Sequence, residues 1–218
     1  MKKRILSLDI SAALVLTMLP AGALAAGDKG TPPVYNKATG CYEISTPDQL
    51  LYLSGSWKDG APRDGHYVLT ADIDMTGVKG FKPIASKKDK GFIGTFDGQF
   101  HAIKGLRVEY EKKYAGLFGY VGNQDDQAYI KDVALLDCYV TGQQNVGALA
   151  GVNYGTITGC VVTGEVKCLD LSNSHTAGGI CGKLKEGEGP IVGHVEDCYV
   201  NADVSAPYDA GGVAGIQD

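Results

Sequence analysis

Four copies of one short glycine-rich motif are the feature that most constrains how this chain folds. Each copy has two small residues, then an aliphatic residue, and ends in glycine. The copies are AGLFG, GALAG, GGICG and GGVAG, and they begin at positions 115, 147, 178 and 211. By subtraction, the steps along the chain from each copy to the next are 32, 31 and 33. A period of about 20 to 50 residues is typical of solenoids, propellers and repeat arrays, so the chain is predicted to stack copies of one unit.

A second element follows three of the four glycine motifs. It reads IKDV at 130–133, ITGC at 157–160 and VEDC at 195–198. Counted from the start of the glycine motif, its lag is 15, 10 and 17 in the three copies. The period is thus kept while the length of the connecting loop varies, which predicts loops that project from a regular framework.

The composition of each unit favours strands over helices. The units are rich in Gly, Thr and Val, and their apolar runs are too short for an ordinary helix. In the clearest unit, strands are predicted at 146–150, 156–162 and 165–169, with turns at 153–155 and 163–164.

No strand has an obvious hairpin partner within its unit, so each is expected to pair with its counterpart in the next unit. The prediction is an all-β parallel β-solenoid whose apolar side is buried only by stacking. A β-propeller is the alternative, but its blades usually run to about 40 residues with hairpin turns.

The same residues resemble a known family. The resemblance to the GLUG-repeat proteins of bacterial surfaces covers residues 42–218. It is carried by the glycine motifs and by two longer runs, GTFDGQFHAIKGL at 94–106 and TITGCVVTG at 156–164. It implies a right-handed β-helix-like fold on secreted proteins, some of them adhesin-like. The region is also similar to one found in certain IgA-cleaving metallopeptidases.

Residues 1–25 have the pattern of a secretory signal peptide. Three basic residues at 2–4 precede an apolar run at 10–19, and Ala-Leu-Ala at 23–25 is a small-x-small cleavage site. The mature chain is therefore expected to be secreted or displayed on the cell surface. The segment is too short and too interrupted to stay in a membrane, so no membrane insertion is expected after cleavage.

The mature chain is predicted to be acidic. Removal of 1–25 leaves 17 basic and 24 acidic residues, a net charge of −7 instead of −5. Nucleic acids and anionic membranes select for basic surfaces, so neither is an expected partner.

Three regions are expected after the signal peptide. Residues 26–40 are predicted to be a disordered linker, 41–110 an N-terminal cap with the first coils, and 111–218 the GLUG-type repeats. The last repeat stops soon after its glycine motif, so we expect the chain to be a fragment of a longer protein.

A short capping helix is expected to begin near Thr46. Its hydroxyl suits the N-cap, Pro47 suits the first turn, and Gln49 completes a capping box. Leu50, Leu53 and Trp57 would then share the face that covers the open N-terminal end of the stack.

Acidic residues provide the only candidates for a metal or catalytic role. In the alternating stretch 65–75, Asp72 and Asp74 point away from the apolar side, and with Asp97 they could bind Ca²⁺, although a solvated face is the favoured interpretation. Acids on an outer face could also cleave polysaccharide. The candidates are Asp72, Asp74, Asp97, Glu165 and Asp170. The sequence alone does not bring any two of them together.

The motifs of most common hydrolases are missing. The sequence has no His-Glu-x-x-His, no Gly-x-Ser-x-Gly and no P-loop. His101, which follows the Asp97-Gly98 turn, is interpreted as a structural hydrogen-bonding residue. We therefore predict no catalytic residue, no metal and no cofactor, and expect that these residues are not an enzyme.

Six cysteines leave the redox chemistry open. Cys160 and Cys198 occupy the same place in their units, so they should stack on neighbouring rungs, either as buried thiols or as a disulfide. Cys181 falls at a packing position, and Cys138 is an alternative counterpart of Cys160. No Cys-x-x-Cys is present, which disfavours a zinc cluster.

The favoured function is adhesion, binding or spacing, with a host or bacterial surface glycan or glycoprotein as partner. The polar insertion at 183–193 is the first candidate contact surface, whereas the charged loop at 87–90 is expected to be solvated. The alternative is the non-catalytic N-terminal part of a secreted hydrolase, either an IgA-type metallopeptidase or a polysaccharide-cleaving enzyme.

Overall fold

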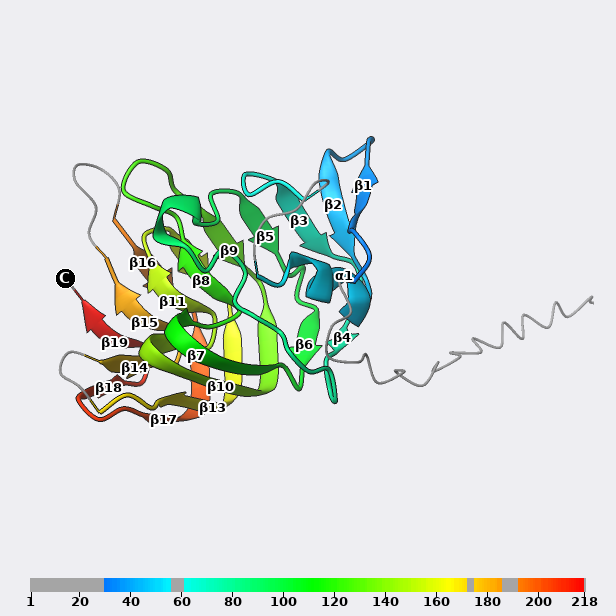
Figure 1. Cartoon of the computed structure of the whole chain (residues 1–218). Coiled ribbons are helices and arrows are strands. Elements are labelled where there is room, and N and C mark those ends of the chain that lie inside the picture. Colours follow the sequence, from blue (N-terminus) through cyan, green and yellow to red (C-terminus); the bar gives the residue numbers. More distant parts are fainter. Residues whose placement is uncertain (1–29, 56–60, 172–174, 186–191, 218) are drawn as a thin grey trace, which may run out of the picture.

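The computed structural model describes residues 30–55, 61–171, 175–185 and 192–217. These residues form an all-β structure with three sheets, one short α-helix and one 3₁₀ turn (Figure 1). Among the described residues, β1 and β2 pair antiparallel, and all other paired strands run parallel. The prediction of an all-β chain with parallel pairing between units is confirmed.

The first sheet has seven strands in the described ranges. In spatial order its members are β1 (Val34–Asn36), β2 (Cys41–Ile44), β3 (His66–Leu69), β5 (Thr95–Asp97), β9 (Tyr129–Lys131), β12 (Thr156–Thr158) and β16 (His194–Glu196). Ile130 pairs with Ile157, and Ile157 pairs with Val195. The IKDV, ITGC and VEDC elements are therefore in register.

The second sheet is the largest, and the third is the narrowest. The second contains β4 (Ile73–Asp74), β6 (Ala102–Lys104), β7 (Arg107–Ala115), β10 (Ala134–Gly147), β13 (Val161–Cys168), β14 (Thr176–Gly178), β17 (Tyr199–Ser205) and β18 (Asp209–Gly211). The third contains β8 (Phe118–Val121), β11 (Ala150–Asn153), β15 (Cys181–Leu184) and β19 (Ala214–Gln217). Two isolated parallel bridges, from Ile84 to Phe118 and from Phe92 to Val121, extend the third sheet toward the N-terminal end.

The chain visits the three sheets in the same order on each pass, and we call each pass a coil. The coils are coil 1 (66–92), coil 2 (95–121), coil 3 (129–153), coil 4 (156–184) and coil 5 (194–217). Because each coil is hydrogen-bonded to the next, positions separated by one whole repeat become direct neighbours.

The glycine motif is a corner, although the sequence pattern predicted a strand at 146–150. β10 ends at Gly147, and β11 begins at Ala150 in a different sheet. Ala148 and Leu149 between them are fully buried. A Cβ atom on Gly147 would lie 2.5 Å from the Cα of Cys181 in the next coil, so the close approach of two backbones requires glycine here.

A second corner divides the strand predicted at 156–162 into β12 and β13. Gly159 at this corner has a φ of +63°, and the equivalent Asp132 and Asp197 have +54° and +50°. The predicted turn at 163–164 is also wrong, because both residues lie within β13. Gly164 has a φ of +129° and pairs with Cys138, next to a bulge in which Leu136 and Asp137 of β10 stand opposite Thr163 alone.

The glycine motifs of consecutive coils lie side by side, and the pairing register is shifted by one residue at the start of the first motif. Gly147 pairs with Gly178, and Gly178 pairs with Gly211. In the first copy Ala115 pairs with Val146, one residue earlier, and the register is regained where Phe118 pairs with Ala150.

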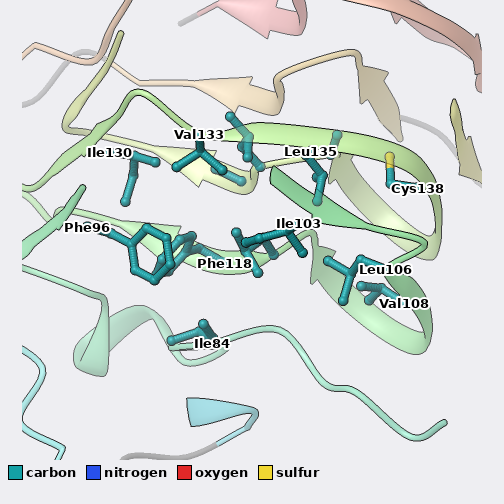
Figure 2. Close-up of a cluster of buried hydrophobic side chains, with 14 of the residues drawn as sticks. Ile84, Phe96, Ile103, Leu106, Val108, Phe118, Ile130, Val133, Leu135 and Cys138 are labelled. Carbon is teal, nitrogen blue, oxygen red and sulfur yellow. The ribbon is translucent and has the colours of Figure 1, made fainter. Parts of the chain in front are cut away.

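The core lies between the three sheets. Phe96 and Phe118 meet edge to face with ring centroids 5.5 Å apart. Figure 2 shows them beside Ile84 and Ile103, with Leu135 from the next coil turned toward the same interior. All of these side chains are at most 1% exposed. Since one coil supplies too few apolar side chains to enclose itself, stacking creates this core.

The predicted capping helix is present as α1 (Pro47–Leu53). The Gln49 N–H donates to the Thr46 hydroxyl at 3.3 Å, while the Gln49 side chain accepts from the Ser45 N–H at 2.7 Å, one residue earlier than the capping box predicts. Leu50 and Leu53 are buried in the common core. Figure 1 shows α1 at the end of the molecule opposite β19. Trp57 lies outside the described residues.

Two other N-terminal predictions need correction. Residues 26–40 were expected to be disordered, but residues 34–36 form β1 and pair antiparallel with β2. The alternating stretch 65–75 contains two strands in different sheets, β3 and β4, although its inward and outward sides are as predicted. The signal peptide falls outside the described residues.

Candidate functional site

A groove on the outside of the second sheet is the main candidate binding surface. Three hollows of about 390, 780 and 570 Å³ all include Glu109 in β7, so they adjoin one another. We call them together the β7 groove. It is defined by four segments, 78–82, 107–112, 141–143 and 169–171, with residues 54–55 and 86–87 lining one end. These segments come from coils 1, 2, 3 and 4, so the groove crosses the stack.

A bulge in β7 shapes one wall of the groove. Tyr110 pairs with Gly142, but the next ladder pair is Lys113 with Gln144. Two residues of β7, Glu111 and Lys112, therefore stand opposite a single residue of β10. Such an irregularity pushes the extra residues out of the ladder and changes where their side chains point. Both are exposed and line the groove.

Charges of both signs line the β7 groove. The Arg107 guanidinium donates to Glu109 Oε1 at 2.9 Å and lies 4.1 Å from the centre of the Tyr139 ring. The hydrogen bond from Arg107 lowers the pKa of Glu109, so this carboxylate is ionised at neutral pH. Lys79 and Lys82 contribute positive charge from coil 1.

The far end of the groove combines an acid with exposed apolar side chains. Leu169 and Leu171 are 59% and 85% exposed, and Asp170 lies between them. Asp170 Oδ2 is 3.7 Å from Nδ1 of His175, which is itself buried. This end therefore offers apolar contact area next to a carboxylate.

The three acids considered for Ca²⁺ binding take part in separate interactions. Asp72 accepts hydrogen bonds from the Ala102 N–H at 2.9 Å and from His101 at 3.0 Å, and both lower its pKa. Asp74 accepts from the Thr76 N–H at 2.9 Å. Asp97 forms an ion pair with Lys131 at 2.7 Å. In the described ranges, no three His, Cys, Asp or Glu side chains gather as a metal site would require.

The structural interpretation of His101 is confirmed by its contact with Asp72, which joins coil 1 to coil 2. Glu165 forms an ion pair with Lys167 on the face of the second sheet. Of the five acids considered for polysaccharide cleavage, Asp170 is the member that lines the groove. Glu109 and Glu111 were missed, although the alternation around buried Val108 indicates that Glu109 faces outward.

A second hollow of about 470 Å³ lies on another side of the molecule. It is lined by Arg63, by Lys88 and Asp89 of the 3₁₀ turn (Lys88–Lys90), by 123–126 and by Tyr154. One guanidinium nitrogen of Arg63, Nη1, is buried without a hydrogen-bond partner among the described residues. The charged loop at 87–90, predicted to be only solvated, thus borders this hollow.

The insertion at 183–193 was the first predicted contact surface. Only 183–185 and 192–193 belong to the described residues, so its central part is not described. Among the helices in the described ranges, none has the length and apolar character that crossing a membrane requires.

The strand pairing shows which residues of neighbouring coils lie beside each cysteine. Val161 pairs with Tyr199, which places Cys160 beside Cys198 as predicted. Cys138 pairs with Gly164 and is not the counterpart of Cys160, and the pairing of Ala134 with Val161 gives that position to Val133. Cys181 pairs with Ala150 and Ala214 and is fully buried, which confirms its packing role.

Parts of two curated proteins are similar to this chain in sequence. The chain is 32% identical over 151 residues to "Halomucin" of Haloquadratum walsbyi, a match that covers 65% of this chain and 2% of halomucin. It is 33% identical over 101 residues to a "Putative Gly-rich membrane protein" of Evansella cellulosilytica, covering 42% of this chain and 11% of that protein. The chain thus spans a small part of these curated relatives.

A solved structure shares the fold. The crystal structure of a "putative immunoglobulin A1 protease from Bacteroides ovatus" superposes with a TM-score of 0.66 over 87% of this chain and 55% of that one, at 24% identity. No family model matches the chain. The resemblance to GLUG-repeat proteins therefore remains a prediction from the motifs.

Proposed function

We propose that the coils form a parallel β-solenoid that works as a secreted or cell-surface binding module without catalysis of its own. The observation that carries this proposal is the β7 groove, which crosses four consecutive coils. An open groove of this length suits an extended polymer better than a small molecule, which binds in an enclosed pocket. Its ligand class would be a surface glycan or glycoprotein.

The chemistry of the groove supports that ligand class. Carboxylates such as Glu109 and Glu111 accept hydrogen bonds from hydroxyl groups, and lysines such as Lys82 and Lys112 donate them. Tyr110 and the exposed leucines add apolar area for the carbon faces of a sugar. A mixed-charge polymer fits this lining, in which five basic side chains (79, 82, 87, 107 and 112) lie among three acidic ones (109, 111 and 170).

The test is binding of the whole chain to a glycan array and to immobilised mucin. The variant Tyr110→Ala/Glu111→Gln should lower affinity at least tenfold, which corresponds to about 1.4 kcal/mol. Glu196→Gln, an exposed acid on the first sheet, is the matched control and should bind normally. Equal binding by both variants, or no binding by the parent chain, would contradict the proposal.

A second candidate function is the non-catalytic part of a secreted hydrolase. It is favoured by the fold shared with the Bacteroides ovatus structure. The whole chain would then bind immunoglobulin A1 or a polysaccharide without cleaving it. Incubation with each polymer, followed by gel or chromatographic analysis, tests this: retention without products supports it, and turnover by this chain contradicts both proposals.

A further inference from the structure

Cys160 and Cys198 meet at the same corner of consecutive coils. The Tyr199 N–H donates to the Cys160 carbonyl at 2.8 Å, so the two backbones are adjacent rungs. Neighbouring strands lie about 4.8 Å apart, and a disulfide needs Cα atoms about 4.4 to 6.8 Å apart. Both are free thiols in this structure, and each is the largest influence on the pKa of the other, so the two side chains lie close together. The spacing therefore suits a bridge without movement of the backbone.

The two thiols have different environments. Cys160 is fully buried, and its Sγ is 3.2 Å from the Thr158 carbonyl. Cys198 is half-buried, and its Sγ is 3.1 Å from the Glu196 carbonyl. A soluble oxidant can therefore reach Cys198 first, and Cys160 is held behind it.

The pKa values of the two thiols also differ, since that of Cys198 is lowered and that of Cys160 is raised. A hydrogen bond from Cys160 lowers the pKa of Cys198 to about 7, although burial and the charges of Asp197 and Glu196 act in the opposite direction. The same contact, together with burial, raises the pKa of Cys160. A thiolate with a lowered pKa attacks disulfides faster at neutral pH than a buried thiol does.

The other four cysteines are placed differently. Burial raises the pKa of Cys138 to about 11 and that of Cys181 to about 12. Cys168 donates to the Gln143 carbonyl at 3.3 Å, and Cys41 lies at the opposite end of the stack in β2. All six cysteines are among the described residues, and strand pairing puts only Cys160 and Cys198 at the same place in consecutive coils.

We propose that Cys160 and Cys198 form an oxidation site that closes a disulfide between coils 4 and 5. The Cys198 thiolate attacks an external disulfide, forms a mixed disulfide and releases one thiolate. Cys160 then loses its proton to solvent and attacks the Cys198 sulfur, which releases the second thiolate. Two protein thiols are oxidised, and one small disulfide is reduced to two thiols.

The bridge would hold coil 5 onto the rest of the stack. Residues of coil 5 such as Val200 and Val204 are only partly buried, so they contribute less to holding the coil in place. A covalent link restricts opening of the strands beside it. Amide hydrogen exchange in β16 and β17 should therefore slow by about tenfold on oxidation, with little change in β5 and β9.

The experiment treats the reduced whole chain with glutathione disulfide near pH 8. Trypsin cleaves after Lys131, Lys167, Lys183 and Lys185, so Cys198 lies alone in 186–218, Cys138 and Cys160 share 132–167, and Cys168 and Cys181 share 168–183. The proposed bridge joins 132–167 to 186–218, and further cleavage after Tyr139 and Tyr154 separates Cys138 from Cys160. The expected result is this linked pair, accompanied by the loss of two hydrogens from the intact mass.

Two variants that are expected to fold distinguish loss of the disulfide from loss of the fold. Cys160→Val copies Val133 in the preceding coil, so it should fold normally and form no link. Cys138→Ser should still form it. A link from 168–183 to 186–218, which would join Cys198 to Cys168 or Cys181, would overturn the proposal. So would six free thiols after treatment of a folded chain.

Discussion

Coils 3 and 5 have the same architecture but bury their side chains differently. Val140 in coil 3, Val166 in coil 4 and Val204 in coil 5 pair in one continuous column. Val140 and Val166 are fully buried, whereas Val204 is only partly buried. The residue type and register are identical, so the difference comes from the neighbouring coils. In a stack, burial is therefore a property of position along the axis rather than of the side chain.

The two ends of the stack show the same effect. At the N-terminal end α1 places Leu50 and Leu53 against the core, and both are at most 3% exposed. In coil 5, Tyr199 is 60% exposed and Val213 is 44% exposed. Among the described residues no element covers coil 5 as α1 covers the first coils. A short amphipathic helix thus supplies what a further coil would otherwise provide.

The largest difference is expected at one glycine of the corner motif. A Cβ on Gly179 would overlap the Gly212 carbonyl oxygen and approach Val200, whereas a Cβ on Gly212 meets nothing within 4 Å. Gly179→Ala should lower the free energy of unfolding by about 3 kcal/mol or more. Gly212→Ala should change it by less than about 0.5 kcal/mol. Urea denaturation compares them, and equal losses would show that coil 5 packs as tightly as coil 4.

The valine column gives the next largest effect. Val140→Ala removes buried methyl groups and leaves a cavity, which should cost about 2 to 3 kcal/mol of unfolding free energy. Val204→Ala should cost about 1 kcal/mol or less, because water already reaches this position. The same denaturation measurement applies to both. A cost for Val204→Ala as large as that for Val140→Ala would contradict the positional explanation.

Substitutions at Thr46, the N-cap of α1, test how the helix stabilises the N-terminal end of the stack. Thr46→Ala removes the acceptor of the Gln49 N–H and should cost about 1 kcal/mol, while Thr46→Ser keeps the hydroxyl and should cost much less. Thermal unfolding followed by circular dichroism compares the two variants. If both are equally destabilised, the methyl group rather than the hydrogen bond matters, and the capping explanation is wrong.

The smallest effect is expected at Asp72, which joins coils 1 and 2. The Ala102 N–H and His101 lower its pKa in the folded chain, so its charge stabilises the fold above the ordinary pKa of about 4 and loses this effect as pH falls through the lowered pKa. Asp72 is exposed, so Asp72→Asn should cost about 0.5 kcal/mol or less at pH 7. The difference from the parent should vanish near pH 2. A difference that grows on acidification would contradict this sign.

The sequence by itself determined the repeat, the parallel register of 130, 157 and 195, the capping helix and the side on which Asp72 and Asp74 lie. These features have local or periodic signals: the nearly constant spacing of the glycine motifs, the alternation of apolar and polar side chains, and a Thr-Pro helix start. The alternation continues through a corner, however, so it did not reveal where one sheet ends and the next begins. That is why 65–75 was predicted as a single strand. The strands predicted at 146–150 and 156–162 rested on composition and short apolar runs, which also continue across the corners.

Only the tertiary structure decided which distant residues meet. Glu109, Gln143 and Asp170 share the β7 groove because consecutive coils stack in register and β7 bulges between them. It also decided that Val133, not Cys138, lies beside Cys160. Stacking brings together positions that are far apart in the chain. A small change in the length of one loop changes which residue of the next coil a position meets, and this leaves no local signal in the sequence.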